Sequence, residues 1–340
     1  MVSSAALDRL LAVAVALLAA TGVLTLRAGA PGDAWLFLAH DVLAGTLAVL
    51  VLVKVGRSVP RAVRARRWRA LTISVGLTGL AAGSLVAGFA AAVGPSVAFL
   101  DLGFVRWTAL SVHAWLGIAL LPILLVHLVP RRWRLLRPGA RAVRVAGRTT
   151  SRRALLFGGA ALGLGIALAG AASLAERVAG GSRRFTGSRL LPAGSVPIAT
   201  TFLGEPVPEV DATAWRIRVE GLVANELDLS LAELRALMEH QVGAVLDCTS
   251  GWAVDASWTG VAVAELLDRA GADDAAMAVE VRAVTGWSAS LPIADARRAL
   301  LAWAIDGKPL PVENGAPLRL VAPDHRGLEW VKWVESIRVV

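Results

Sequence analysis

The stretch Leu246-Asp247-Cys248-Thr249-Ser250-Gly251-Trp252 contains the only cysteine of the 340-residue chain. Val242–Leu246, just before it, predicts a buried strand, and the Ser and Gly residues after it predict a tight loop. A single cysteine excludes an intrachain disulfide, a four-cysteine zinc site and a self-supplied iron–sulfur cluster. Two interpretations of Cys248 follow: a small buried hydrophobic residue, or a thiolate that binds a soft metal at a strand end.

The sequence on both sides of this stretch predicts an α+β domain, dominated by strands, over residues 196–340. Alternating apolar and polar residues are typical of strands, and Ser230-Leu-Ala-Glu233 has the form of a helix-capping box. The expected strands are 215–219, 242–246, 278–284, 318–321 and 333–340, with a short helix from 230 and another over 261–270. We expect residues 177–195, rich in Arg, Gly and Ser, to be a linker.

The N-terminal half has a different composition. Residues 1–189 carry 23 basic and 5 acidic side chains, a net charge of +18, whereas residues 190–340 have a net charge of −9. The whole chain is 56% hydrophobic and 18% charged, below the roughly 25% charged residues of an ordinary soluble domain. Because the basic residues lie between apolar runs, a membrane explains them better than a nucleic acid, and we expect no nucleic-acid partner.

Five apolar runs are long enough to cross a bilayer, which takes about 20 residues. They are 10–26, 35–55, 70–89, 107–129 and 154–174. A secretory signal peptide would explain only the first run. We therefore expect an all-α transmembrane bundle of about five helices: a four-helix domain over 1–135, then a basic loop and fifth helix over 136–176.

Arginines predict the orientation of this bundle. They concentrate in residues 57–69 and 131–153, and the other two short connections are nearly uncharged. The positive-inside rule places the Arg-rich loops in the cytoplasm. The sequence therefore predicts a multi-pass protein of the cell membrane, with its C-terminal domain on the extracytoplasmic side.

Three histidines lie in the apolar runs. His40 and His113 are expected at similar depth, because their spans run in the same direction. His127 lies on the same helix face as His113, about 21 Å further along the axis. Facing imidazoles are what b-type haem iron needs as axial ligands; alternatively, these histidines only form hydrogen bonds between helices.

The spacing of these histidines resembles that of four-helix cytochrome b modules. The resemblance implies one haem b bound by His40 and His113. A second haem at His127 has weaker support, because Lys54 stands where the pattern would have its partner histidine. Separately, Arg152-Arg153-Ala-Leu-Leu156 resembles a twin-arginine export signal, although an arginine pair also satisfies the positive-inside rule.

The C-terminal half resembles the molybdopterin-binding domain of the sulfite oxidase superfamily, closest in pattern to protein-methionine-sulfoxide reductase catalytic subunits. Four segments carry the resemblance in order and spacing: 215–221, 246–252 with Trp258-Thr-Gly260, 313–319 and 329–335. A threonine and an N-terminal segment that contact the cofactor in those reductases are not recognisable. By counting, the threonine falls at Ala283, close to Thr285, and the segment falls within 190–209.

The resemblance implies roles for individual residues. Cys248 would bind molybdenum and be the catalytic residue, while Asn314 and Arg319 would hold the pyranopterin and its phosphate. The cofactor would also be lined by Trp330, Val331 and Lys332, and we expect His325 and Arg326 in the preceding loop to face the same pocket.

These features together predict a membrane-anchored molybdenum oxidoreductase that uses Mo-molybdopterin and haem b. Its expected partners are the quinone pool, membrane lipid and a small-molecule or protein-bound S-oxide or N-oxide that it reduces. One alternative is sulfite-type oxidation, with electrons passed to the membrane. Another is a non-catalytic membrane protein whose outer domain is a binding module, which the intact set of Cys248, Asn314 and Arg319 disfavours.

Overall fold

The structure, a computed structural model, describes residues 3–94, 96–103, 106–136, 152–198, 200 and 205–340, with side chains except those of residues 5, 69–70 and 125–136. The chain divides into two units. One comprises residues 1–25, 34–95 and 109–180, and the other comprises residues 26–33, 96–108 and 181–340. Each unit is described by itself below.

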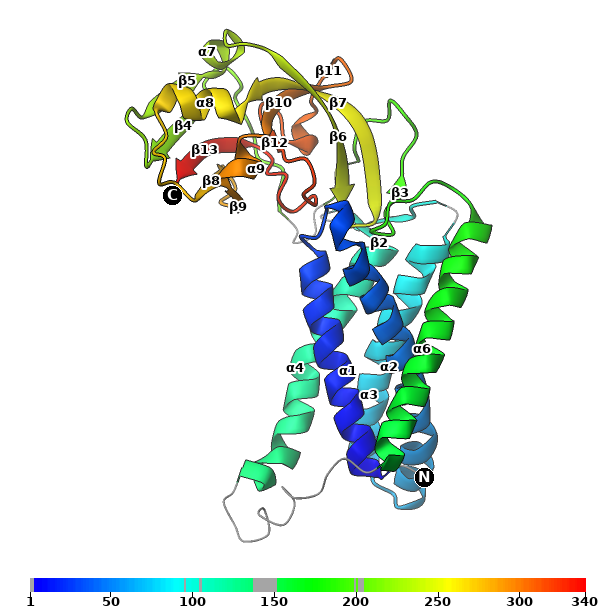
Figure 1. The fold of residues 1–340 in the computed structure, drawn as a ribbon. Helices are drawn as coiled ribbons and strands as arrows, with labels where there is room; N and C mark the ends of the chain where they lie inside the picture. Colours follow the sequence, from blue (N-terminus) through cyan, green and yellow to red (C-terminus); the bar gives the residue numbers. More distant parts are fainter. Residues whose placement is uncertain (1–2, 95, 104–105, 137–151, 199, 201–204) are drawn as a thin grey trace. The chain divides into compact units, whose positions relative to one another are not determined.

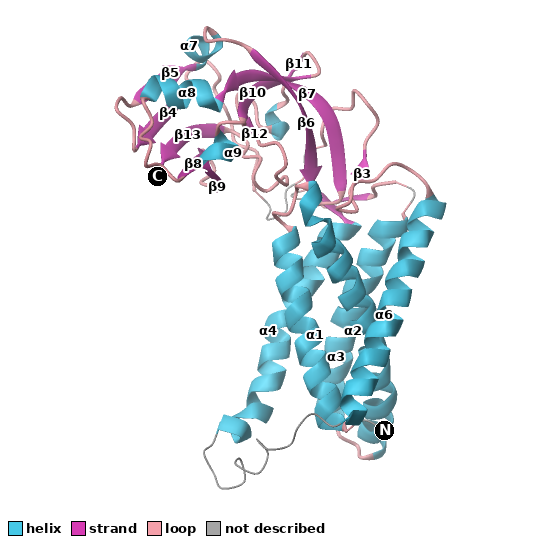
Figure 2. Ribbon diagram, viewed as in Figure 1, coloured by secondary structure: helices cyan, strands magenta, loops and turns pink. Residues whose placement is uncertain are grey.

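The described part of the first unit is a bundle of five helices (Figures 1 and 2), as the apolar runs predict. They are α1 (Ser4–Thr25), α2 (Ala34–Arg64), α3 (Trp68–Val93), α4 (Ala109–Leu136) and α6 (Arg152–Ala179). Four of them, all except α4, are long and apolar enough to cross a membrane in the described part of the chain. In α4 the described side chains form an apolar stretch over Ala109–Leu124.

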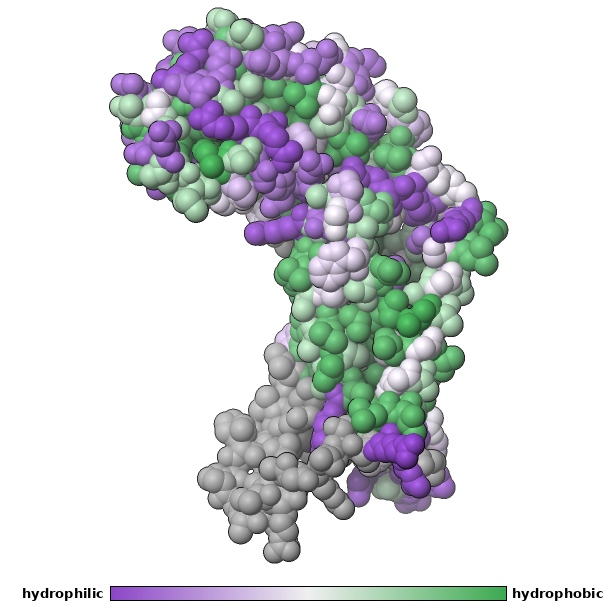
Figure 3. All heavy atoms as spheres, in the orientation of Figure 1, coloured by the Kyte–Doolittle hydropathy of each residue, from purple (hydrophilic) through white to green (hydrophobic). Residues whose placement is uncertain are grey.

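Packing and surface both suit a bilayer. Helix α2 packs on α1 and α6, and α3 packs on α4. Leu7, Leu47 and Leu50 are buried between α1, α2 and α6, whereas large apolar side chains such as Leu52 and Val86 are exposed. Figure 3 shows apolar residues covering the helices. Exposed apolar surface on this scale is costly in water and favourable in lipid.

The described part of the second unit is built mainly from a six-stranded sheet and a five-stranded sheet, with short helices (Figure 2). The six-stranded sheet comprises β11 (Lys308–Pro309), β10 (Leu300–Ile305), β7 (Trp252–Ala262) and β3 (Arg189–Leu190), with β6 (His240–Cys248) on β7 and β12 (Arg319–Val321) on β10. The five-stranded sheet has the order β5 (Leu227–Ser230), β4 (Arg216–Gly221), β13 (Val334–Val339), β8 (Ala278–Ala283), β9 (Ser288–Pro292). Strands β4 and β13 are parallel and the other pairs of this sheet are antiparallel, so the sheet is mixed.

Shorter elements complete this unit. They are the helices α7 (Leu231–Arg235), α8 (Val263–Ala270) and α9 (Ile293–Ala296), the 3-10 turns η1 (Pro31–Asp33) and η2 (Val312–Asn314), and the hairpin β1 (Phe99–Asp101)–β2 (Arg106–Thr108). The predicted capping box is present: Ser230 Oγ accepts from Glu233 N, and the Glu233 carboxylate accepts from Ser230 N. The α+β class is therefore confirmed.

The structure differs from several sequence-based expectations. Residues 261–262 are the end of β7 rather than a helix, and α8 begins at Val263. Residues 177–195 are not simply a linker, because they contain the end of α6 and then β3, which pairs with β7. The connections 26–33 and 96–108, expected within the membrane domain, belong to the second unit.

Candidate functional site

Cys248 is the last residue of β6, where it pairs across the sheet with Trp252 of β7. A tight turn joins the two strands: Gly251 N donates to Cys248 O at 2.9 Å, and Ser250 N lies 3.5 Å from Cys248 Sγ. Gly251 has φ +90°, a conformation that favours glycine. The thiol, only partly buried, is thus held at a strand end.

A cavity in the second unit brings Cys248 together with four of the other predicted site residues. Asn314 comes from η2, Arg319 from β12, and Trp330 and Lys332 from the segment before β13. The lining residues are Ile198, Thr200, Leu246, Cys248, Trp252, Glu313, Asn314, Arg319, Gly327, Trp330 and Lys332. Motifs separated by up to 84 residues in the sequence therefore meet at one place.

Arg319 is a buried cation in this cavity, 5% exposed. Its Nη1 donates to Asn314 O at 2.7 Å, but its Nε is buried and makes no hydrogen bond. Its Cζ lies 5.9 Å from the ring centroids of both Trp258 and Trp330. Burial lowers the pKa of Arg319 to about 10, although the guanidinium stays charged at neutral pH. Among the described residues, no carboxylate lies within 4.0 Å of it.

Lys332 is a second buried cation. Its Nζ lies 3.5 Å from Glu205 Oε2 and 4.0 Å from the Trp333 ring centroid, yet it makes no hydrogen bond. Burial lowers the pKa of Lys332 to about 8. Burial of two cations with unsatisfied N–H groups, opposed by one carboxylate, lowers the stability of the folded chain when no ligand is bound. They are the arrangement expected where an anion binds.

The side chains fit the group that the sequence implies. Molybdopterin carries a phosphate, for which buried guanidinium and ammonium groups are suitable donors, and its molybdenum is a metal that suits a thiolate ligand. Trp252 Nε1 is also buried without a hydrogen bond at the cavity wall. Unused donors beside the only thiol therefore match an anionic, metal-bearing group.

Sequence reasoning missed several residues at this site. Thr200 Oγ1 lies 3.2 Å from Cys248 Sγ, and Ile198 is also in the lining. Glu205 accepts a hydrogen bond from Thr285. Thr285 lies two residues after Ala283, the position at which counting along the sequence places the cofactor-contacting threonine of the reductases. The sequence around Thr200 and Glu205 shows no periodic pattern. The one indication of this part of the site was that Thr285 lies close to the position of the cofactor-contacting threonine in the reductases.

Three predicted residues lie outside the lining of this cavity. Val331 is 1% exposed, and its carbonyl accepts from Leu320 N. His325 Nδ1 lies 2.8 Å from Glu329 Oε2, and Glu329 and Asp295 raise the pKa of His325. His325 therefore contacts carboxylates and is not among the lining residues of this cavity.

Arg326 likewise does not line the cavity but supports the Cys248 backbone. Its Nη2 donates to Asp247 Oδ1 and to Cys248 O, each at 3.1 Å. Asp247 is 1% exposed and also accepts from Thr186 and Ser188. Arg326 thus belongs to a buried network behind the thiol.

In the helical unit the rings of His40 and His113 lie close together, with centroids 6.0 Å apart and planes at 81°. His40 Nδ1 lies 2.9 Å from Thr21 Oγ1, whose own hydrogen is directed to a helix carbonyl. His113 Nδ1 lies 2.8 Å from Ser84 O, which can only accept. The carbonyl contact places the proton of neutral His113 on Nδ1, which leaves a lone pair on its Nε2. The Thr21 hydroxyl is compatible with the same tautomer of His40.

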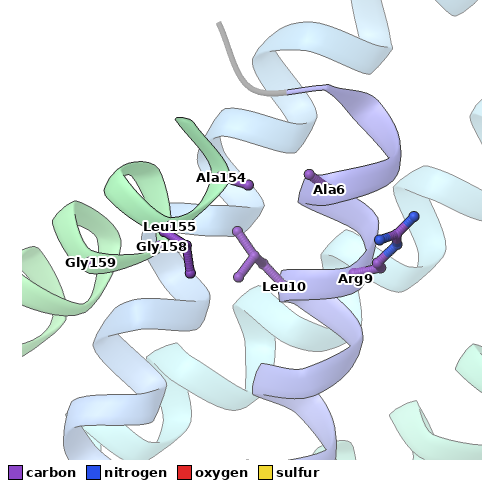
Figure 4. Close-up of a pocket in the computed structure, with 7 residues that line it drawn as sticks. All are labelled: Ala6, Arg9, Leu10, Ala154, Leu155, Gly158 and Gly159. Atoms are coloured by element: carbon purple, nitrogen blue, oxygen red, sulfur yellow. The ribbon is translucent and has the colours of Figure 1, made fainter. Parts of the chain in front are cut away.

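The second haem position predicted at His127 is not described, since the side chains of 125–136 lie outside the described set. Lys54, the only partner that the sequence offered for it, forms an ion pair with Asp8. A different cavity lies in the helical unit between α1 and α6 (Figure 4), where Leu10 points toward α6 and Arg9 extends away from it. Its described lining contains no thiol, imidazole or carboxylate, so we assign it no redox role.

Comparison with known proteins agrees with the site. Residues 204–340 match the family model "Oxidoreductase molybdopterin binding domain". The chain is 34% identical over 131 residues to the uncharacterized oxidoreductase YuiH of Bacillus subtilis, covering 38% of this chain and 66% of that protein. It is 33% identical over 144 residues to the protein-methionine-sulfoxide reductase catalytic subunit MsrP of Xanthomonas campestris, covering 37% and 45%.

A likeness in structure is weaker. The sulfane dehydrogenase SoxCD of Paracoccus pantotrophus aligns with a TM-score of 0.38 and 23% identity, covering 39% of this chain and 40% of that one. The chain spans under two thirds of the length of the curated relatives named above. The family model and the curated relatives show a molybdopterin-binding oxidoreductase domain over residues 204–340, homologous to domains of sulfite oxidases and of methionine-sulfoxide reductases.

The buried lysine leads to a prediction about stability. Lys332 has a pKa of about 8 in the folded chain, against about 10.4 when unfolded. Between these values the unfolded state binds more protons, so stability rises with pH. Burial of the protonated lysine lowers the free energy of unfolding by about 3 kcal/mol below pH 8. This destabilisation decreases as the pH rises toward 10.4. We expect Lys332→Met to stabilise the cofactor-free chain at pH 7.5 and to remove this rise.

The measurement is the thermal unfolding midpoint of the cofactor-free chain between pH 7.5 and 9.5. The chain has three lysines and no tyrosine, so few other groups titrate in this range. Lys308→Met, which replaces an exposed lysine, is the matched control and should leave the rise intact. An equal rise in Lys332→Met and Lys308→Met would show that Lys332 is not the source.

Proposed function

We propose that this chain is a membrane-anchored, molybdenum-dependent oxidoreductase that exchanges electrons with the quinone pool through a b-type haem. The observation that carries the proposal is the pair of buried cations, Arg319 and Lys332, whose unsatisfied donors line one cavity with the only thiol of the chain. An anion bound beside these groups would offset the free-energy cost of burying their charges.

Different side chains of the cavity would bind different parts of the molybdopterin. Cys248 supplies a thiolate ligand to the metal, with the Thr200 hydroxyl 3.2 Å from its sulfur. Arg319 and Lys332 neutralise the phosphate and the metal centre, and Trp330 closes the wall. When bound, the molybdopterin supplies two-electron oxygen-atom transfer. The protein binds it, orients it and excludes water.

The geometry of His40 and His113 supports haem ligation. A ligating histidine normally donates its other ring N–H to a carbonyl or hydroxyl, which fixes the ring. Ser84 O can accept from His113 Nδ1, and Thr21 Oγ1 can accept from His40 Nδ1, which in each case would leave an Nε2 lone pair for iron. Two such imidazoles from α2 and α4 meet the requirement for axial ligands.

Charge favours reduction of an uncharged S-oxide or N-oxide over oxidation of sulfite. Arg319 and Lys332 are matched by the cofactor, and Glu313 is the other charged residue in the described lining. No cation of that lining is left to bind an anionic substrate. The relative MsrP is named as a protein-methionine-sulfoxide reductase, which agrees with an S-oxide substrate.

The direction of electron flow can be tested in membranes that contain the full chain. After reduction of the haem by a quinol, addition of dimethyl sulfoxide, methionine sulfoxide or trimethylamine N-oxide should restore the oxidised haem spectrum. Sulfite should leave oxidised haem unchanged. Reduction of the haem by sulfite, with no response to any oxide, would instead establish the oxidase direction.

Export of the C-terminal domain is a further prediction of this proposal. A reporter fused after Val340 should be active only outside the cytoplasm, and one inserted near Arg64 only inside, because the Arg-rich loops stay in the cytoplasm. If the domain crosses the membrane already folded, Arg152→Lys with Arg153→Lys should retain it inside. Export of that double variant at the normal level would contradict the twin-arginine interpretation.

A further inference from the structure

Two connections between helices contribute to the unit that contains Cys248. Leu26–Asp33 follows α1 and Ser96–Thr108 follows α3, yet both belong to the unit formed by residues 181–340. Val97 and Phe99 of the second connection pack against the apolar core of that unit. The second connection contacts the turn that follows Cys248, and the first contacts a loop that is bonded to Asp247 and Cys248.

Thr108 holds the turn after Cys248. It is 4% exposed, and its Oγ1 donates to Ser250 O at 2.6 Å, across 142 residues of sequence. The same turn is closed by Gly251 N donating to Cys248 O. Because Ser250 N also lies 3.5 Å from Cys248 Sγ, a shift of residue 250 would move a donor of the sulfur.

Gly29 packs against the loop 324–327 on the other side. A Cβ at Gly29 would lie 2.5 Å from Asp324 O and 2.7 Å from His325 C, so only glycine permits this approach. Its neighbour Ala28 forms an antiparallel bridge with His325. The first connection is therefore fitted to the backbone of this loop.

That loop in turn holds the cysteine. Gly327 N donates to Asp247 O at 2.7 Å, and a Cβ at Gly327 would lie 3.1 Å from Cys248 Cα. Arg326 donates to Cys248 O. Arg184 links the first connection to the residue before Cys248, since its Nη2 donates to Gly29 O and its Nε lies 3.2 Å from Asp247 Oδ2.

We propose that Gly29 and Thr108 are positioning residues for the Cys248 thiol, so that the two connections complete the metal-binding site. The role of the thiol as a molybdenum ligand rests on the function proposed above, whereas the positioning itself is a property of the cofactor-free protein. Neither residue lines the described cavity. Both act through the backbone that carries the thiol.

The thiol can be measured directly, because Cys248 is the only cysteine. The full chain, purified in detergent from cells that make no molybdopterin, is alkylated with iodoacetamide and the rate is followed by mass spectrometry. We expect Thr108→Val and Gly29→Ala to raise the rate at least fivefold. Thr108→Ser, which keeps the hydroxyl, and Gly32→Ala, whose Cβ meets no atom within 4 Å, should stay within twofold of the wild type.

In cofactor-loaded protein the same two variants should lower kcat about tenfold with KM unchanged, and Thr108→Ser should restore it. Rates within twofold of the wild type for both Thr108→Val and Gly29→Ala would overturn the proposal, and a folded Thr108→Val decides it even if Gly29→Ala is unstable. A wild type that never acquires molybdenum would contradict the proposed function instead, and the alkylation result would still stand.

Discussion

Replacement of Cys248 by alanine should abolish molybdenum-dependent turnover and leave the haem absorption unchanged. Loss of an outer partner of a metal ligand already costs about 10- to 100-fold, so loss of the ligand itself should cost more than about 100-fold. The chain contains no second cysteine that could substitute. The measurement is turnover per chain with an S-oxide, alongside the absorption spectrum of the same preparation.

The haem band in that preparation is the internal control, because the histidines belong to the helical unit. Turnover at the wild-type level would show that Cys248 is not the ligand. Loss of the haem together with turnover would show that the two cofactors do not occupy separate folding units.

His40→Ala and His113→Ala should each eliminate the spectrum of a low-spin haem, because iron with two axial imidazoles loses that state when either is removed. Substitution of His127 by alanine should leave at least half of the haem signal. The measurement is the reduced-minus-oxidised absorption spectrum of the purified chain, normalised to protein. Two haems in the wild type, with one lost in His127→Ala, would contradict the single-haem assignment.

A second test of the histidine pair uses glycines of one helix. A Cβ at Gly88 would lie 2.8 Å from His113 Nδ1, so Gly88→Ala should displace the ring and reduce haem content. Gly79→Ala, on the same helix α3, meets no atom within 4 Å and should retain the haem. Equal haem content in these two variants would argue against His113 as a ligand.

The parts of the fold that the sequence predicts are those with a local signal. The apolar runs predict the helices because a bilayer requires a fixed length, and Ser230 with Glu233 predicts the start of α7 through a local pair of hydrogen bonds. Strand β7 was missed. A local signal was present there, because residues 254–260 alternate buried positions with more exposed ones, as in a strand with one covered face.

The candidate site divides in the same way. Cys248, Asn314 and Arg319 stand in recognisable motifs, and the structure brings them together. His325 and Arg326 were expected in the cavity because they are near Trp330 in sequence. Instead His325 contacts Glu329, and Arg326 donates to Asp247 and to the Cys248 carbonyl. Thr108 and Gly29 could not be predicted, since their contacts join segments far apart in the sequence and leave no periodic pattern.

We propose that Cys248 and the buried cations around it hold a molybdenum cofactor. The most direct measurement is the metal content of the full chain, purified from cells that synthesise molybdopterin, together with that of Cys248→Ala. We expect about one molybdenum and one haem per wild-type chain, and haem without molybdenum in the variant. A folded wild-type chain that contains haem but no molybdenum, or equal molybdenum in both proteins, would contradict this proposal.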